Sequence, residues 1–201
     1  MCVSRCLRCV GVALVALTIV SFLSNLFLLF PHMETRFLLE GHVTREALWC
    51  TGLWGSGLTV LLGARSFLVS SHTSGCCAFR SKMVSLVLVS LVCCVVAGFS
   101  SLVSLTGLVQ GPMCLYNSTS RGPTWGVPLK PTADRDPGYL WNSSLWSSVC
   151  MEPQDVVQWN LVWFGLQSGS GLVQTLLCAI NLLNAMMGLV LGPNQVGRTK
   201  A

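Results

Sequence analysis

Four long apolar runs dominate this 201-residue sequence and limit the ways in which it can fold. A helix needs about 20 apolar residues to cross roughly 30 Å of hydrocarbon. Charged residues make up only 9% of the chain, against about 25% in a typical soluble domain. We therefore expect an all-α membrane protein, a four-helix transmembrane bundle with spans at residues 10–30, 47–70, 83–108 and 157–191.

The remaining segments divide into short connections and one long polar loop. A basic start followed by an apolar run also describes a cleavable signal peptide, but the first run is longer than the ~7–15 residues of a typical signal core and lacks a small-x-small cleavage site. We therefore expect an uncleaved first span. The expected connecting segments are residues 1–9, 31–46, 71–82, 109–156 and 192–201, of which 109–156 is the large loop.

The large loop carries signals of the extracellular or lumenal side. It contains Asn117 and Asn142, each in an Asn-x-Ser/Thr sequon for N-glycosylation. It also contains Cys114 and Cys150, and disulfides persist in that oxidising compartment. We expect these two cysteines to pair and close the loop, with Cys50 near the same interface as a competing partner.

The distribution of charge gives an orientation without reference to the sequons. The segments on the opposite side from the large loop contain basic residues and no acidic ones, whereas the loops 31–46 and 109–156 contain all seven acidic residues. The positive-inside rule then predicts that both termini are cytoplasmic, in agreement with the sequons. The basic residues that carry this argument are Arg5, Arg8, Arg65, Arg80, Lys82, Arg198 and Lys200.

Five further cysteines lie near the predicted cytoplasmic boundary of the membrane. Juxtamembrane cysteines beside basic residues are candidates for S-palmitoylation. Zinc is disfavoured because no Cys/His set has the paired spacing of a zinc site, and we expect neither a metal nor a cofactor. The candidates for acylation are Cys2, Cys6, Cys9, Cys76 and Cys77.

Polar amides recur along the fourth apolar run at intervals of seven residues. This spacing keeps one helix face turned toward a partner, and amides in hydrocarbon hydrogen-bond across helices, at about 0.6 kcal/mol each. Gly165 and Gly169 on the same run predict close helix packing. We interpret the amides as interhelical contacts, with the lining of a ligand cavity as the alternative. The predicted stripe is Asn160, Gln167, Gln174 and Asn181, extended by Asn184 and joined by Asn25 of the first span.

Composition also disfavours other functional classes. The 12 basic residues are dispersed among the ends of the apolar runs, whereas nucleic-acid binders gather them on one face, so we expect no nucleic-acid partner. The spans contain no Asp, Glu, Lys or His, and transport or proton relay commonly uses such groups at membrane depth. No paired carboxylates, nucleophile elbow or phosphate-cradling loop is present. The sequence therefore indicates a protein that is not an enzyme.

Short motifs are distributed along nearly the whole chain. They are Arg8-Cys9-Val10-Gly11, Gly52-Leu53-Trp54-Gly55, Gly75-Cys76-Cys77, Gly111-Pro112-Met113-Cys114, Cys150-Met151-Glu152-Pro153 and Asn181-Leu182-Leu183-Asn184. Together these motifs resemble the L6 family of four-span membrane proteins, which share their topology with the tetraspanins. The large loop lacks the Cys-Cys-Gly motif of true tetraspanins, and it is the second outer loop, whereas claudins enlarge the first. The chain departs from the family in two ways: Gln174 stands where members often have Glu, and no cysteine follows Leu191.

The resemblance implies a non-enzymatic organiser or adaptor in the plasma membrane or an endolysosomal membrane. Its expected partners are the lipid bilayer and membrane proteins bound laterally, such as receptors, adhesion proteins or a larger complex, with a homo-oligomer as a further alternative. The competing hypothesis is a sensor or regulator that binds a sterol or a small polar ligand within the bundle and modulates a transporter or pump.

Overall fold

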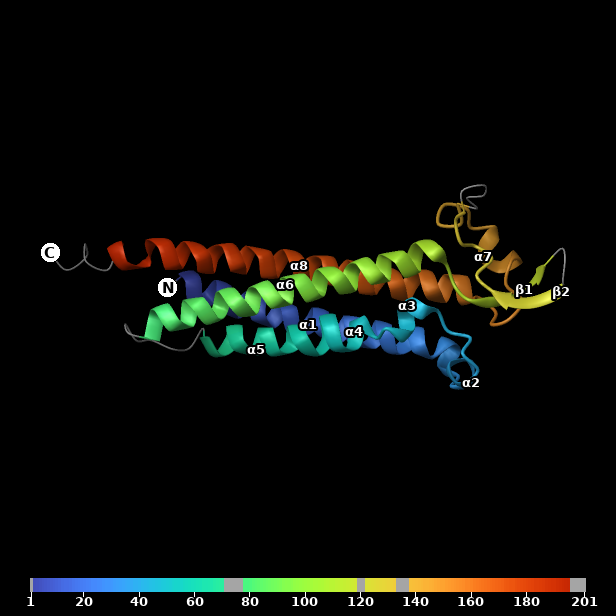
Figure 1. Ribbon diagram of the computed structural model, residues 1–201, viewed down its shortest axis with the longest axis horizontal. Coiled ribbons are helices and arrows are strands. Elements are labelled where there is room, and N and C mark those ends of the chain that lie inside the picture. Colours follow the sequence, from blue (N-terminus) through green and yellow to red (C-terminus); the bar gives the residue numbers. More distant parts are fainter. Residues whose placement is uncertain (1, 71–77, 119–121, 133–137, 196–201) are drawn as a thin grey trace.

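A computed structural model shows an elongated helical bundle with a platform of loops at one end (Figure 1). The structure describes residues 2–70, 78–118, 122–132 and 138–195, with the side chains of all but residues 2–6, 78–80 and 191–195. The N-terminus and the C-terminus both lie at the end of the bundle opposite the platform (Figure 1). The two ends of the molecule are therefore chemically distinct.

The bundle consists of three long helices and one interrupted helical segment. The long helices are α1 (Cys2–Leu29), α6 (Ala78–Gln110) and α8 (Val156–Gln195). The interrupted segment, here called the second span, comprises α4 (Thr51–Leu53), the π-helical stretch η2 (Trp54–Thr59) and α5 (Val60–Ser70). Helix α8 packs along both α1 and α6, and α1 packs along α5. Helical segments of this kind pair most of their backbone polar groups internally, as a bilayer requires.

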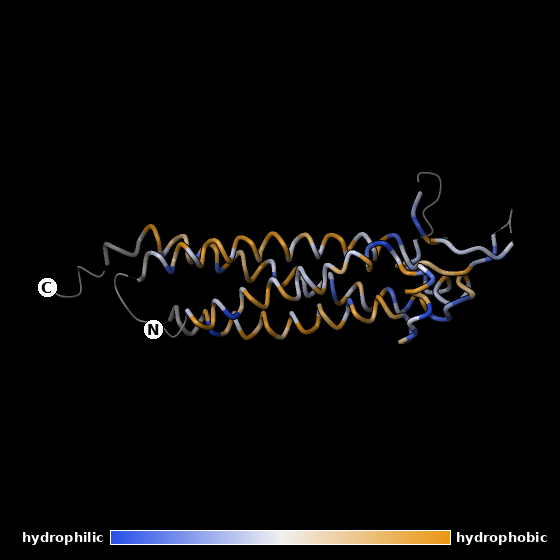
Figure 2. The backbone as a smooth tube through the Cα atoms, turned by 60° about the horizontal axis from the view of Figure 1, so that its bottom comes forward, coloured by the Kyte–Doolittle hydropathy of each residue, from blue (hydrophilic) through white to orange (hydrophobic). Residues whose placement is uncertain are grey.

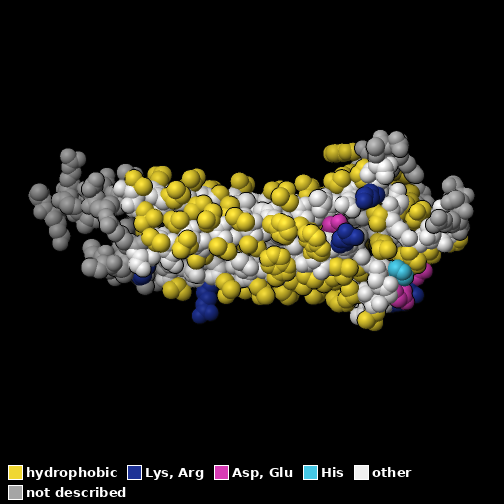
Figure 3. Space-filling model, viewed as in Figure 1, with side chains coloured by type: hydrophobic (Ala, Val, Ile, Leu, Met, Phe, Trp, Pro, Cys, Tyr) yellow, Lys and Arg dark blue, Asp and Glu magenta, His cyan; other side chains and the backbone are white. Residues whose placement is uncertain are grey.

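Length and apolar composition qualify four of these segments to cross a membrane within the described part of the chain. They are Leu7–Leu29, Thr51–Ser70, Ser81–Gln110 and Val156–Val190. Hydrophobic residues run along the length of the bundle, and hydrophilic ones gather at the platform (Figure 2). On the face drawn in Figure 3, apolar side chains cover the bundle and the Asp and Glu side chains lie near the platform. The expected fold class, a four-helix transmembrane bundle, is confirmed.

The second span begins in the structure at Thr51, later than the residue 47 expected from the sequence. The short helix α3 (Arg45–Leu48) precedes it, and Cys50 breaks the helical path with a left-handed φ of 52°. The N–H groups of Leu53 and Trp54 both donate to the carbonyl of Cys50. The π-helical stretch η2 follows after the three residues of α4, and such stretches are frequent at functional sites. The helix of the second span is therefore irregular from Cys50 to Thr59.

The predicted close packing at Gly165 and Gly169 is wrong. A Cβ added at either glycine would have no heavy atom within 4 Å, because this face of α8 points away from the bundle. Gly171, two residues further on, lies against α6: its added Cβ would be 3.1 Å from the Cβ of Ser101 and 3.3 Å from the carbonyl oxygen of Ala97. The small residue that permits the close α6–α8 contact is thus outside the recognised motif.

The platform combines the two loops at the end of the bundle. Its short connection contains η1 (Pro31–Met33) and α2 (Arg36–Leu39), and its large loop contains α7 (Leu145–Ser148) and a pair of antiparallel strands. These strands, β1 (Cys114–Ser118) and β2 (Gly122–Gly126), pair with Cys114 opposite Gly126. An isolated bridge joins Leu115 to Glu152 across the loop. No pattern in the sequence predicted this hairpin.

Candidate functional site

The amides of the predicted stripe enter the centre of the bundle. Asn160, Gln167, Gln174 and Asn181 of α8 are all buried, as is Asn25 of α1, and Gln174 is fully inaccessible. We call these five residues the polar column. The Nε2 of Gln174 donates to the backbone oxygen of Ser56 at 3.1 Å. The Nδ2 of Asn181 donates to the Oγ of Ser90 at 2.8 Å. These two amides therefore join α8 to the second span and to α6.

Serine hydroxyls extend this polar contact to all four spans. The Oγ atoms of Ser21 in α1 and Ser170 in α8 lie 2.8 Å apart. Ser56 of the second span donates to Ser100 of α6 at 2.6 Å, and Ser101 donates to the carbonyl oxygen of Ser168 at 3.1 Å. The sequence indicates Ser21 of the first span as a partner for the stripe, but serine is common in all the apolar runs, so its spacing alone did not mark Ser56 or Ser100.

Asn184 does not belong to the column, contrary to the sequence prediction. It is exposed, and Ala185 occupies the buried face at this level of α8. Three residues advance a helix by less than one full turn, so Asn184 is rotated away from the direction in which Asn181 points. The seven-residue spacing correctly predicted which face of α8 is buried, whereas the added step of three residues to Asn184 reached an exposed position.

A disulfide closes the large loop, as the sequence predicts. Cys114 on β1 is bonded to Cys150, and their Cα atoms lie 5.7 Å apart. The competing partner, Cys50, is a free cysteine whose thiol donates to the carbonyl oxygen of Leu48 at 3.3 Å. The bond fixes the start of the hairpin to the segment that leads into α8.

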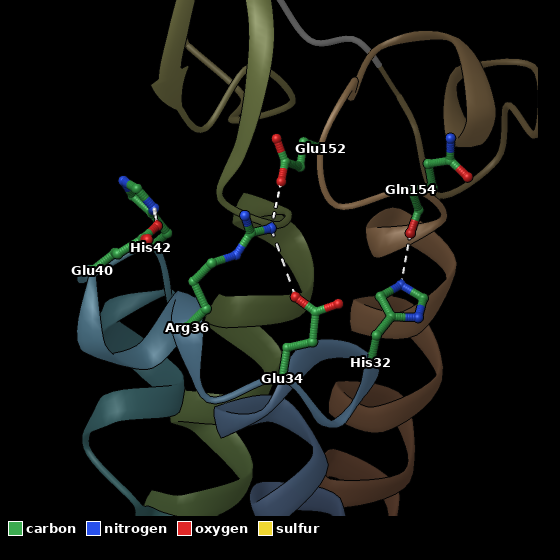
Figure 4. Close-up of polar contacts among 7 residues, drawn as sticks. All are labelled: His32, Glu34, Arg36, Glu40, His42, Glu152 and Gln154. Carbon is green, nitrogen blue, oxygen red and sulfur yellow. Dashed lines mark hydrogen bonds and ion pairs between the residues drawn. The ribbon is translucent and has the colours of Figure 1, made fainter.

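An ion pair connects the short loop to the large one (Figure 4). The guanidinium of Arg36 donates to Glu152 at 2.5 Å and lies 3.6 Å from the carboxylate of Glu34. This hydrogen bond to Glu152 raises the pKa of Arg36, an effect that desolvation opposes. The three side chains are about half exposed, so the pair contributes little to stability and mainly fixes the relative position of the loops.

Two histidines make further contacts within the platform. The Nε2 of His32 lies 2.7 Å from the backbone oxygen of Gln154, and its ring stacks on Trp159 at a centroid distance of 5.2 Å. The ring of His42 stacks on Trp125 of β2 at 3.7 Å, with its Nδ1 3.2 Å from Glu40 (Figure 4). The short loop thus contacts both the hairpin and the start of α8.

Tyr139 attaches the large loop to the end of α6. Its hydroxyl donates to the carbonyl oxygen of Leu108, and its own carbonyl oxygen accepts a 2.7 Å hydrogen bond from the indole of Trp146. Carbonyls in the last turn of a helix have no partner within the helix, so Tyr139 satisfies one of them. The side chain is 3% exposed, and burial raises its pKa to about 12.

We expect the stability of the platform to fall as pH rises from about 10 to 12, because an unfolded tyrosine ionises near pH 10 while folded Tyr139 keeps its proton. The unfolded state then binds fewer protons in this window, and about 2–3 kcal/mol is lost across it. The chain has two tyrosines, so absorbance titration of wild type minus Y139F isolates this phenol. A difference spectrum that titrates fully near pH 10 would contradict the burial.

Exposed groups on the platform provide a candidate contact surface. Trp141 is 93% exposed and lies beside Asn142, the exposed asparagine of the second sequon. Asn117, the asparagine of the first sequon, is exposed on β1. Tryptophan is enriched at protein interfaces and at membrane interfaces, so Trp141 is a candidate contact residue. The sequon positions are thus accessible to modification.

The predicted acylation sites lie mostly outside the described side chains. Cys9 is an exposed free cysteine on α1. The side chains of Cys2 and Cys6, and the residues Cys76 and Cys77, lie outside the description. Across the described ranges, no group of three or more His, Cys, Asp or Glu side chains is arranged to hold a metal ion.

Together the fold and the site define a class: a multi-pass membrane protein with four apolar spans, a polar bundle core and a disulfide-closed loop. The family model described as L6 membrane protein matches residues 1–195, and the chain belongs to this family. No solved structure matches the chain.

The similar relatives cover nearly the full length of the chain. Transmembrane 4 L6 family member 1 of Homo sapiens is 34% identical over 96% of this chain and 95% of its own. Transmembrane 4 L6 family member 4 of Mus musculus is 32% identical over 97% of this chain and 95% of its own. Transmembrane 4 L6 family member 19 of Mus musculus is 31% identical over 94% and 92%. These relatives are named as membrane proteins and not as enzymes.

Proposed function

We propose that the protein is a non-enzymatic organiser of membrane complexes, which binds other membrane proteins laterally and presents its platform to them. The observation that carries this proposal is the joining of two loops into one surface by the Cys114–Cys150 disulfide and the Arg36–Glu152 ion pair. A surface held from several points has little conformational entropy to lose on binding. Trp141 supplies a rigid aromatic anchor on it.

The orientation and modifications belong to the same proposal. Both termini are cytoplasmic, the platform is extracellular or lumenal, Asn117 and Asn142 carry glycans, and Cys2, Cys6, Cys9, Cys76 and Cys77 are the acylation sites. The protein resides in the plasma membrane or an endolysosomal membrane. The sequence segments on the opposite side from the large loop contain basic and no acidic residues, which supports this orientation through the positive-inside rule.

The alternative, a sensor or regulator that binds a sterol or a small polar ligand at the amide stripe and modulates a transporter or pump, has less support. The amides of Gln174 and Asn181 hydrogen-bond directly to neighbouring helices, which is the behaviour of interhelical contacts. The polar column therefore supports a rigid bundle on which the platform is mounted.

Crosslinking in native membranes followed by capture in mild detergent tests the organiser proposal. We expect a membrane-protein partner in stoichiometric amounts with wild type and a reduced yield with W141A, because the exposed indole is removed. L172A is the matched control, since Leu172 is an exposed apolar residue on the bundle surface, away from the platform. Recovery of the monomer alone from wild type would count against the proposal.

Glycosidase treatment of the same samples reads the orientation separately. The wild type should shift to lower mass, and N117Q and N142Q should each remove part of the shift, because sequons are modified only on the extracellular or lumenal side. An unshifted wild type with normal partner capture would reject the proposed glycosylation and leave the organiser proposal standing.

A further inference from the structure

Several buried atoms of the polar column, and one of neighbouring Thr51, have no hydrogen-bond partner among the described protein atoms. They are the Nδ2 of Asn160 and, deeper in the bundle, side-chain oxygens of Asn25, Thr51, Gln167 and Gln174. Each of these residues is at most 4% exposed. A polar group in an apolar medium is strongly destabilised when it has no hydrogen-bond partner. A ligand that restores these hydrogen bonds therefore gains a substantial free energy.

The upper level of these atoms, near the platform, lies at a small cavity. The cavity has a volume of about 20 Å³, and its lining includes His42, Thr44, Trp159 and Asn160. A space of roughly 10–15 Å³ or more holds one water molecule when polar partners are present. The Nδ2 of Asn160 and the ring of His42 are such partners. The cavity thus has room for a molecule the size of water.

The next level lies one heptad deeper, about 10 Å along α8, at the break in the second span. A Cβ added at Gly52 would be 2.7 Å from the Cβ of Asn25 and 2.7 Å from the Nε2 of Gln167, so these two side chains pack against the segment that contains Thr51 and Gly52. Asn25, Thr51 and Gln167 each have one buried side-chain oxygen without a hydrogen-bond donor. This level therefore lacks donors.

The lower end of the column differs from these two levels. Gln174 is half satisfied, because its Nε2 donates to Ser56 while its Oε1 has no partner. Asn181 donates to Ser90, and neither of its polar side-chain atoms is among the unpaired ones. The level at Asn181 is thus the one level of the column without an unpaired side-chain atom among the described residues.

We propose that ordered water binds in the polar column from the Asn160 cavity down to the helix break at Gln167, and that the column is dry at Asn181. Water fits because it both donates and accepts, whereas a cation satisfies only the oxygens and the spans contain no carboxylate to balance its charge. Bound water joins α1, the second span and α8 at the point where the backbone is broken.

Water-edited solid-state NMR on the intact protein in lipid bilayers tests this proposal. Polarisation from water should reach the side-chain NH₂ groups of Asn160 and Gln167 quickly, approaching the rate of exposed Gln154 on the platform, and should reach Asn181 slowly. Slow transfer to Gln167, at the rate of Asn181, would overturn the hydrated level. Fast transfer to Asn181 would overturn the dry end. Both outcomes are read from wild type, so neither depends on a variant that folds.

Two variants test whether water reaches Gln167 through the cavity at Asn160. N160L fills the upper cavity with an apolar side chain, and we expect loss of water transfer to Gln167. N184L is the matched control, since Asn184 is an exposed amide on the same helix outside the column. Unchanged transfer to Gln167 in folded N160L would show that water does not enter through this cavity, contrary to the proposal.

Discussion

Replacing both Cys114 and Cys150 by serine is expected to lower the free energy of unfolding of the platform by about 3–4 kcal/mol. The two residues are 36 positions apart in the chain, and the bond removes the closure entropy of that loop from the unfolded state. Its loss also frees the hairpin, because Cys114 is the first residue of β1. Limited proteolysis of the large loop measures this change, and the double variant should be cut at much lower protease concentration.

The single replacement C50S serves as the control for this experiment. Cys50 is free and makes one weak contact to the carbonyl of Leu48, so its loss should leave proteolysis unchanged. Equal protection of the double variant and wild type would show that the remaining contacts, such as Arg36 with Glu152 and Tyr139 with Leu108, hold the loop without the disulfide.

The sequence predicted the features that depend on one strong physical constraint. Apolar length alone identifies the spans, because hydrocarbon admits few alternatives to a helix. The repeat of seven identified Asn160, Gln167, Gln174 and Asn181 as one face, and all four are buried. The disulfide followed from two cysteines in the only long polar loop.

Features that depend on contacts between distant segments were not predicted. Strand β2 contains Gly and Pro, which are weak strand formers, and the bridge from Leu115 of β1 to Glu152 helps to hold the hairpin. The break at Cys50 has no signal in the sequence, since cysteine is rarely left-handed. The prediction of close helix packing at Gly165 and Gly169 was wrong because the spacing of a motif does not show which way its residues face. These two glycines have the spacing of a packing motif but face outward.

This difference between glycines leads to a second large expected effect. G52V should destabilise the folded bundle by about 1–3 kcal/mol, the usual cost of overpacking. Even the first added carbon would lie 2.7 Å from Asn25 and from Gln167, and 2.8 Å from the carbonyl oxygen of Ser21. The backbone carbonyl has little freedom to move away, so α1 and the second span must separate. Denaturant titration of the protein in mixed micelles measures the loss.

G169A provides the matched control on α8. A Cβ at this position meets nothing within 4 Å, and alanine is favoured over glycine inside a helix by up to about 1 kcal/mol. We therefore expect G169A to be as stable as wild type or slightly more stable. If G169A were instead the destabilised variant and G52V were neutral, α8 would have to pack through its glycine motif, and the polar column would lie on a different helix face. The two glycines thus test the rotation of α8 that buries Gln167 and Gln174 together.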